Sequence, residues 1–102
     1  MARYRMDDST IVDTENATGA WGCRNVRGPS IGDVCVHTNS ETEHEHLYRS
    51  RKNRYYLVHE SLREGRQPRA EWVSRHAAAA WLMLNGNPIP PDLADVVDDV
   101  VE

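Results

Sequence analysis

Alternation of apolar and polar residues is clearest in the middle of the chain, where it predicts a β-hairpin. Residues 46–49 and 54–59 form two alternating runs rich in tyrosine and aliphatic side chains. The polar stretch 50–53 separates them and predicts the turn. Asn53 suits this turn, because asparagine adopts a positive φ more readily than most residues with a side chain. A tyrosine-rich hairpin is therefore the firmest element that the sequence predicts.

Shorter alternating runs predict more strands on either side of this hairpin. Residues 3–6 and 10–12 are typical of a short N-terminal hairpin, and 33–38 and 70–73 of single strands. Stretches that are polar, or that contain glycine and proline, are expected to be loops at 25–32, 39–43 and 63–69. The order of these elements predicts a small twisted antiparallel sheet.

Apolar residues at helical spacing predict one main helix after the last strand, over residues 75–85. Ser74 is a suitable N-cap, and Ala78, Trp81 and Leu82 share one face of this helix. A following Asn-Gly pair and a nearby proline end it. We expect this helix to be purely structural, with its apolar face packed against the sheet.

Two shorter helices complete the predicted architecture. Asp13 or Thr14 can cap a helix near 14–21, with its alanine and tryptophan side chains on one face. A last helix near 92–101 carries several aspartates and no basic residue, so its C-terminus is expected to fray. The prediction is a single α+β domain over residues 1–102, with the helices on one face of the sheet.

The composition fits one ordinary globular domain. The chain has 102 residues, of which 39% are hydrophobic and 27% charged, and it contains no phenylalanine. No apolar run approaches the roughly 18 residues that a membrane span needs, and no signal-peptide pattern is present. We therefore expect a cytoplasmic protein. Cys23 and Cys35 are too few for a disulfide scaffold, and reduced thiols are expected in that compartment.

The charge is unevenly distributed, and this points to the hairpin as a binding surface. The net charge is −4, but residues 47–75 hold eight basic and three acidic side chains, against four basic and thirteen acidic elsewhere. Arginine and tyrosine are among the residues that most often anchor protein interfaces. The predicted partner-binding residues are Tyr48, Arg49, Arg51, Lys52, Arg54, Tyr56, Arg63, Arg66 and Arg69. The partner is a protein, or a second copy whose acidic segment meets this basic face.

Nucleic acid is the alternative partner for the same hairpin. Cations neutralise phosphates, and aromatic side chains stack on bases. Strand alternation divides the set, however, because Arg54 and Tyr56 share one face while Tyr55 lies on the other. Some of the tyrosines must therefore be core residues, and the acidic remainder of the chain would repel a polyanion. These observations favour a protein partner.

A zinc site is a second alternative. Cys35 and His37, and likewise His44 and His46, have the i, i+2 spacing that places both side chains on one face of a strand. With Cys23 these residues include a Cys₂His₂ set, which is a legitimate zinc ligand set. Their spacing matches no standard finger or ribbon. The prediction is therefore no metal and no cofactor.

Catalytic candidates are weaker still. His59, Glu60 and Ser61 are consecutive, but neighbours on a strand face opposite ways. A nucleophile needs a base within hydrogen-bond reach, and this arrangement does not supply one. Cys35 and His37 share a face but lie roughly 6–7 Å apart along a strand. The sequence therefore predicts a protein that is not an enzyme.

Several segments together resemble a group of small uncharacterised prokaryotic proteins of bacterial genomes and mobile elements. The shared features are an Asp-Thr-Glu-x-Ala segment at 13–17, a Leu-Tyr-Arg hairpin at 47–50 followed by an aromatic strand, and a Ser-capped helix with alanine and tryptophan three apart. The likeness covers nearly the whole chain without a single diagnostic motif. Asn53, where glycine is usual, and residues 75–77, where acids are usual, depart from the pattern, and the cysteines are not part of it.

This resemblance implies no established activity. Small proteins of this type on phages or plasmids are similar to inhibitors of host defence, including anti-CRISPR proteins, which act mostly by occluding a surface of a larger complex. The resemblance therefore implies a non-enzymatic inhibitor that binds a host protein complex.

Overall fold

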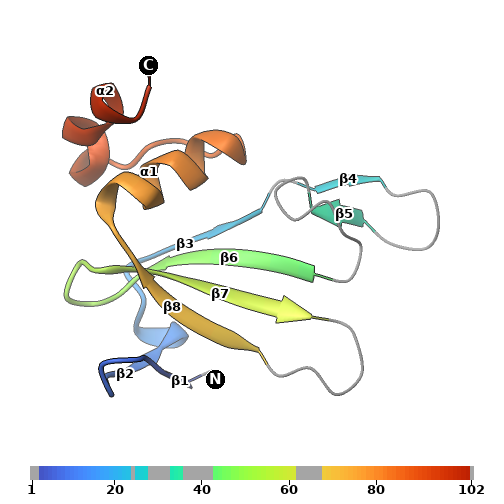
Figure 1. Cartoon of the computed structure of the whole chain (residues 1–102), viewed down its shortest axis with the longest axis vertical. Helices are drawn as coiled ribbons and strands as arrows, with labels where there is room; N and C mark the ends of the chain where they lie inside the picture. Colours follow the sequence, from blue (N-terminus) through green and yellow to red (C-terminus); the bar gives the residue numbers. More distant parts are fainter. Residues whose placement is uncertain (1–2, 24, 28–32, 36–42, 62–67, 102) are drawn as a thin grey trace.

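The chain folds around a four-stranded antiparallel sheet in the order β3-β6-β7-β8 (Figure 1). The computed structural model describes residues 3–23, 25–27, 33–35, 43–61 and 68–101. The main strands are β3 (Gly19–Gly22), β6 (Glu43–Arg49), β7 (Tyr55–Ser61) and β8 (Arg69–Val73). Two antiparallel pairs flank them, β1 (Arg3–Arg5) with β2 (Ile11–Asp13) and β4 (Asn25–Arg27) with β5 (Asp33–Cys35). The helical segments are η1 (Thr14–Asn16), α1 (Arg75–Leu84), η2 (Pro91–Val96) and α2 (Val97–Val100). The predicted α+β class is confirmed.

Both faces of the main sheet are covered. Figure 1 shows α1 and α2 over one face, here called the helix face, and the β1–β2 pair against the other, here called the hairpin face. Tyr55 and Leu57 belong to the cluster on the helix face, whereas Tyr56 and Val58 belong to the cluster on the hairpin face. This double cover explains why four consecutive residues of β7 are buried. The sequence predicted the helices on one face, but not the N-terminal hairpin on the other.

The tyrosine-rich hairpin is present, and it is longer than predicted. Strands β6 and β7 pair from Arg49 opposite Tyr55 to Glu43 opposite Ser61. Asn53 has a φ of 64°, as its position in the turn requires. The predicted N-terminal hairpin and the strand at 70–73 are also confirmed.

The helix predicted near 14–21 is wrong beyond its first turn. Asp13 does act as a cap, since its side chain accepts a hydrogen bond from the Glu15 N–H at 3.0 Å, but only a 3₁₀ turn follows. The next residues form β3, which pairs with β6. The Trp21 ring folds back over Gly19, where an added Cβ would lie 2.5 Å from the indole. Strand pairing with β6 therefore wins over a helix that Gly19, within its predicted span, would weaken.

The loop predicted at 25–32 is also partly wrong, because its first three residues form strand β4. Val26 pairs opposite Val34, so the strand predicted at 33–38 is present over its first three residues. The remainder of both segments lies outside the described residues, as do residues 63–67 of the predicted loop at 63–69. The pairing of β4 with β5 depends on how the chain folds back on itself, and the polar sequence of residues 25–32 does not predict it.

Helix α1 follows the sequence prediction closely. The Ser74 hydroxyl accepts a hydrogen bond from the Ala77 N–H at 3.0 Å, which caps the first turn. Ala78, Trp81 and Leu82 are buried against the helix face. The helix ends at Leu84, with Asn85 as its C-cap, and a glycine with a positive φ of 71° follows.

The C-terminal segment is helical, as predicted, but mostly as a 3₁₀ turn. Segment η2 precedes the single α-helical turn of α2. Leu93 and Val96 are buried in the helix-face cluster, and the Arg75 guanidinium is ion-paired with Asp95. These contacts fix the acidic segment to α1. No helix among the described residues has the length and apolar character to cross a membrane.

Candidate functional site

The turn that joins β6 to β7 is held by a network of hydrogen bonds. The name basic tip is used below for residues 49–54. The Ser50 hydroxyl accepts hydrogen bonds from the N–H groups of Lys52 and Arg54, at 3.3 and 3.1 Å. The Ser50 N–H donates to the Arg54 carbonyl at 2.7 Å, and the Asn53 N–H donates to the Ser50 carbonyl at 2.9 Å. This network fixes the backbone from which Arg51 and Lys52 project into solvent.

Arg54 is held against the hairpin face. Its guanidinium carbon lies 3.8 Å from the centroid of the Trp72 ring, and its Nη1 lies 3.5 Å from a carboxylate oxygen of Asp8. Trp72 in turn packs edge-on against Tyr56, with ring centroids 5.8 Å apart. Arg54 therefore joins the tip to the core as well as carrying charge.

Arg49, which the sequence placed in the binding surface, is used within the fold. Its Nη1 donates to Asp92 at 2.7 Å, and its Nε donates to the Thr18 hydroxyl at 2.9 Å. Only 21% of its side chain is exposed. Arg49 therefore ties the sheet to the C-terminal helical segments, and it presents little of its charge to a partner.

The predicted role of Tyr56 in partner binding needs correction, because its side chain has 0% exposure. Tyr55 is buried on the opposite face, where its hydroxyl donates to Asp92 at 2.7 Å. Tyr48 is half-buried and stacks on Tyr56, with ring centroids 5.4 Å apart. The prediction that Arg54 and Tyr56 share a face, with Tyr55 on the other, is confirmed. Neither Tyr55 nor Tyr56 offers a ring on which a base can stack.

The other predicted cations do not extend the tip. Arg69 is exposed but pairs opposite His59, four residues along β7 from the tip. It lines a separate hollow beside β1 that also includes Arg3 and Arg5. The predicted residues Arg63 and Arg66 lie outside the described residues.

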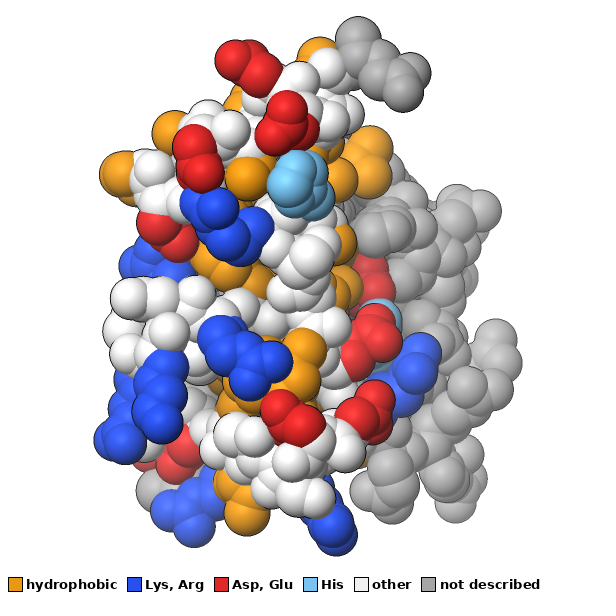
Figure 2. Space-filling view, turned by 60° about the vertical axis from the view of Figure 1, so that its left-hand side comes forward, with side chains coloured by type: hydrophobic (Ala, Val, Ile, Leu, Met, Phe, Trp, Pro, Cys, Tyr) orange, Lys and Arg blue, Asp and Glu red, His pale blue; other side chains and the backbone are white. Residues whose placement is uncertain are grey.

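Acidic and basic side chains are unevenly spread over the surface. In the view of Figure 2, Asp and Glu side chains at the top lie over the C-terminal helical segments, whereas the lower half carries most of the Lys and Arg side chains together with several Asp and Glu side chains. The acidic segment is partly neutralised by contacts with arginines, at Asp92 with Arg49 and at Asp95 with Arg75. The pKa of Asp95 is lowered, chiefly by the hydrogen bond from Arg75.

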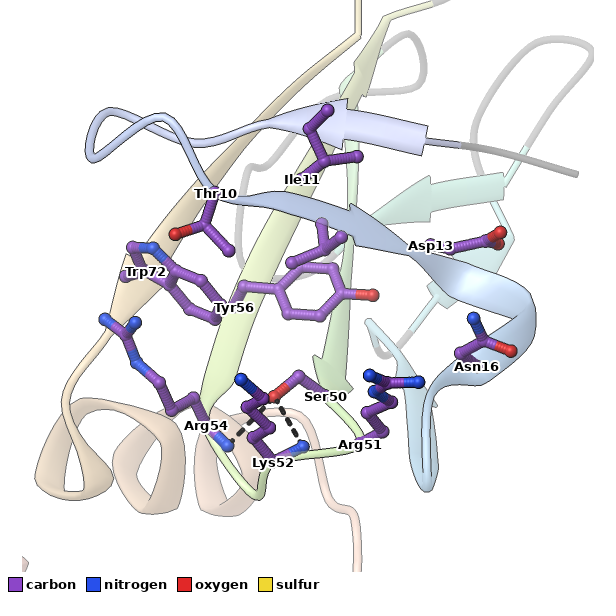
Figure 3. A pocket seen from close by; sticks show the side chains of 11 residues that line it. Thr10, Ile11, Asp13, Asn16, Ser50, Arg51, Lys52, Arg54, Tyr56 and Trp72 are labelled. Carbon is purple, nitrogen blue, oxygen red and sulfur yellow. Dashed lines mark hydrogen bonds between the residues drawn. The ribbon is translucent and has the colours of Figure 1, made fainter.

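A pocket of about 340 Å³ lies between the basic tip and the N-terminal hairpin (Figure 3). Its lining includes Asn16, Arg51, Lys52, Arg54, Tyr56 and Trp72. The ring of Tyr56 crosses the middle of the pocket, with its hydroxyl directed toward the side lined by Arg51 and Asn16. Burial raises the pKa of Tyr56 to about 12, so the hydroxyl stays protonated at neutral pH. The sequence did not predict this pocket, because its two walls lie about forty residues apart in the chain.

The zinc candidates are brought together only in part. The Cys23 Sγ lies 3.9 Å from the Nδ1 of His44, whereas His46 lies 3.6 Å from Glu60. His37 and the side chain of Cys35 lie outside the described part of the structure. Within that part, no group of three or more His, Cys, Asp and Glu side chains is arranged to hold a metal.

His59 lies in a network that sequence reasoning missed. Its Nδ1 is 3.0 Å from Glu45, which is buried, and its Nε2 is 3.0 Å from Glu71. Glu45 also accepts a hydrogen bond from the Trp81 indole at 3.2 Å. The hydrogen bond to Glu45, followed by that to Glu71, raises the pKa of His59. Carboxylates on both ring nitrogens favour the protonated imidazole, which suits a structural link between sheet and helix.

Comparisons with protein-family models, with curated proteins and with solved structures found no match for this chain. The predicted family resemblance therefore stays a prediction. What the geometry offers is a rigid, exposed basic tip with a pocket beside it.

Proposed function

We propose that this chain is a non-enzymatic protein-binding module that docks its basic tip on an acidic surface of a larger host complex. In keeping with the resemblance described above, it is encoded by a phage or another mobile element and acts in the cytoplasm as an anti-CRISPR-like inhibitor. The single observation that carries the proposal is that the charges of Arg51 and Lys52 are exposed and not neutralised by any described residue. Both are exposed, and within the described residues neither is ion-paired.

The contrast with the neighbouring arginines supports this choice. Arg49 is paired with Asp92, and Arg54 with Asp8, so both charges are already partly neutralised. The charges of Arg51 and Lys52 are left for an external partner. Because the Ser50 network fixes the turn, binding orders little backbone, and the loss of backbone entropy on association is small.

Nucleic acid is less well supported as the partner. Binding to single strands commonly combines a basic groove with aromatic side chains that stack on bases. Tyr55 and Tyr56 are buried, and Tyr48 stacks on a neighbouring ring. The tip therefore offers charge without a stacking platform, which suits an acidic protein surface better.

The test is co-purification from the native host with the charge of the tip reversed. We expect the Arg51→Glu/Lys52→Glu double variant to lose its partner. For the wild type, we expect the rate of association with the partner to fall with added salt. Arg69→Glu is the matched control, because Arg69 is also exposed but lies away from the tip. We expect this control to keep the partner.

Two outcomes would contradict the proposal. If the double variant retains its partner at the wild-type level, the tip is not the binding surface. If treatment of the lysate with nuclease removes the complex, the partner is a nucleic acid.

A further inference from the structure

The pocket beside the basic tip contains a buried hydroxyl that the fold does not use. Tyr56 has 0% exposure, and its Oη has no hydrogen-bond partner among the described residues. A buried polar group without a partner destabilises a protein by roughly 1–3 kcal/mol. Replacing this tyrosine by phenylalanine would remove that penalty and keep the ring stacking. The hydroxyl therefore points to a ligand that supplies the missing acceptor.

The side chains around this hydroxyl indicate the charge of that ligand. Figure 3 shows the Tyr56 hydroxyl directed toward the side lined by Arg51 and Asn16, with Lys52 also at the pocket. Arg51 and Lys52 have no ion-pair partner in the described part of the chain, as noted above. Two unneutralised cations and a hydroxyl donor meeting at one cavity favour an anionic group.

The acidic residue at the pocket does not cancel this charge. Asp13 lines the cavity, but it lies 3.3 Å from the Nε of Arg3 and accepts a hydrogen bond from the Glu15 N–H. Its pKa is lowered, chiefly by that backbone hydrogen bond. Its charge is thus partly compensated by groups outside the pocket, although Asp13 is still, after burial, one of the groups that raise the pKa of Tyr56.

We propose that this pocket binds a small organic phosphate, with the phosphate oxygens held by Arg51, Lys52 and the hydroxyl of Tyr56. A phosphate offers three terminal oxygens and a charge of about −1.5 to −2 at neutral pH, whereas a carboxylate offers two oxygens and a single charge, so a phosphate matches two cations and a hydroxyl better. Arginine and lysine are both well suited to phosphate. Because the Tyr56 hydroxyl is buried and the end of Lys52 lies toward the Arg54 side of the pocket in Figure 3, this binding requires side chains at the pocket wall to turn.

The rest of the cavity accommodates the organic part of the ligand. Cavities that hold small molecules are typically about 300–1,000 Å³, and this one, at about 340 Å³, lies at the lower end. Ile11 borders it with 66% of its surface exposed, and Trp72 contributes an aromatic wall. We therefore expect a ring or short chain attached to the phosphate to bind against these two residues.

The experiment is an NMR titration of the purified, isotope-labelled chain with phenyl phosphate, inorganic phosphate and benzoate as probes. We expect phenyl phosphate to bind most tightly and to shift the amide signals of residues 10–16 and 50–56. Inorganic phosphate tests the contribution of the ring, and benzoate tests the preference for phosphate. No partner protein is needed, so the result is independent of the proposed docking function.

Three variants locate the site. Tyr56→Phe should fold at least as stably as the wild type and lose about tenfold in affinity for phenyl phosphate, as expected for one hydrogen bond to a charged group. Arg51→Ala/Lys52→Ala should abolish measurable binding. Arg69→Ala removes one exposed cation outside this pocket and should leave the affinity unchanged.

Clear outcomes would overturn the proposal. The site is wrong if phenyl phosphate produces no saturable shifts at 10–16 and 50–56, or if Tyr56→Phe binds with wild-type affinity. If Arg69→Ala weakens binding as much as the double variant does, the attraction is one of net charge and not of this pocket. If benzoate binds as tightly as phenyl phosphate, the phosphate specificity is wrong.

Discussion

The two faces of the main sheet differ in how they treat buried polar groups. On the helix face, the Tyr55 hydroxyl donates to Asp92, and buried Glu45 accepts from the Trp81 indole and contacts His59. On the hairpin face, the hydroxyl of the adjacent Tyr56 has no partner among the described residues. Two neighbouring residues of the same type therefore have opposite environments.

This difference separates structure from function within one small sheet. Burial of a polar group is tolerated when the group is paired, and is unfavourable when it is not. The helix face meets this condition and forms the larger cluster, so we assign stability mainly to it. The hairpin face leaves a donor unused beside a cationic pocket, so we assign ligand binding to it.

The largest expected effect compares one buried side chain from each face. Leu82, with 0% exposure, lies in the larger helix-face cluster, and Met6, with 2%, lies in the smaller hairpin-face cluster. Leu82→Ala should reduce the free energy of unfolding by about 3–5 kcal/mol, and Met6→Ala by about 2 kcal/mol, because a small cluster beside a pocket collapses more easily. Urea unfolding measures both values. A larger loss for Met6→Ala would reverse our assignment of stability.

The next effect concerns the buried carboxylate of the helix face. Glu45→Ala leaves the Trp81 indole and one nitrogen of His59 without their acceptor, and should reduce the free energy of unfolding by about 2–3 kcal/mol. Glu71→Ala is the matched control, because Glu71 contacts the same imidazole but its side chain is 47% exposed. The control should lose less than about 1 kcal/mol. Equal losses of the two variants in thermal or urea unfolding would show that buried Glu45 contributes no more to stability than exposed Glu71.

A smaller effect is a pH dependence that comes from His59. Its pKa in the folded protein lies above the ordinary 6.5, because Glu45 and then Glu71 hold the proton, while burial and Arg69 oppose them. The stability that protonated His59 gains from these carboxylates is fully present below pH 6.5, and it is lost as the pH rises through the folded-state pKa. The wild type should therefore lose stability relative to His59→Gln above pH 6.5, with a slope of at most about 1.4 kcal/mol per pH unit. A constant difference between the two proteins from pH 6 to 9 would contradict this account.

Much of the fold follows from local patterns. Ser74 and the apolar spacing that follows it predict helix α1, and the alternation around Asn53 predicts the main hairpin, because both signals lie within a few residues. Trp21 misled the prediction, because its spacing from the preceding alanines also fits a helix. The outcome there depends on pairing with β6, far along the chain.

The candidate site was harder to predict, because it depends on contacts between distant segments. The basic tip was recognised from its arginines, but the burial of Tyr56 depends on the N-terminal hairpin that covers it. The contact between Glu45 and His59 depends on the strand register, which places them directly opposite each other. The apolar and polar pattern of one strand predicts neither its register with a neighbour nor which element packs on each face of the sheet.

The most direct test of the difference between the two faces is the change in the free energy of unfolding for Tyr55→Phe and Tyr56→Phe, measured side by side in urea. Both variants remove one buried hydroxyl from adjacent positions of β7. We expect Tyr55→Phe to lose about 1–2 kcal/mol, because Asp92 loses one of its two side-chain donors among the described residues, and Tyr56→Phe to lose nothing or to gain stability. Equal losses in the two variants would mean that the Tyr56 hydroxyl already has a partner in the folded protein, and would contradict the account.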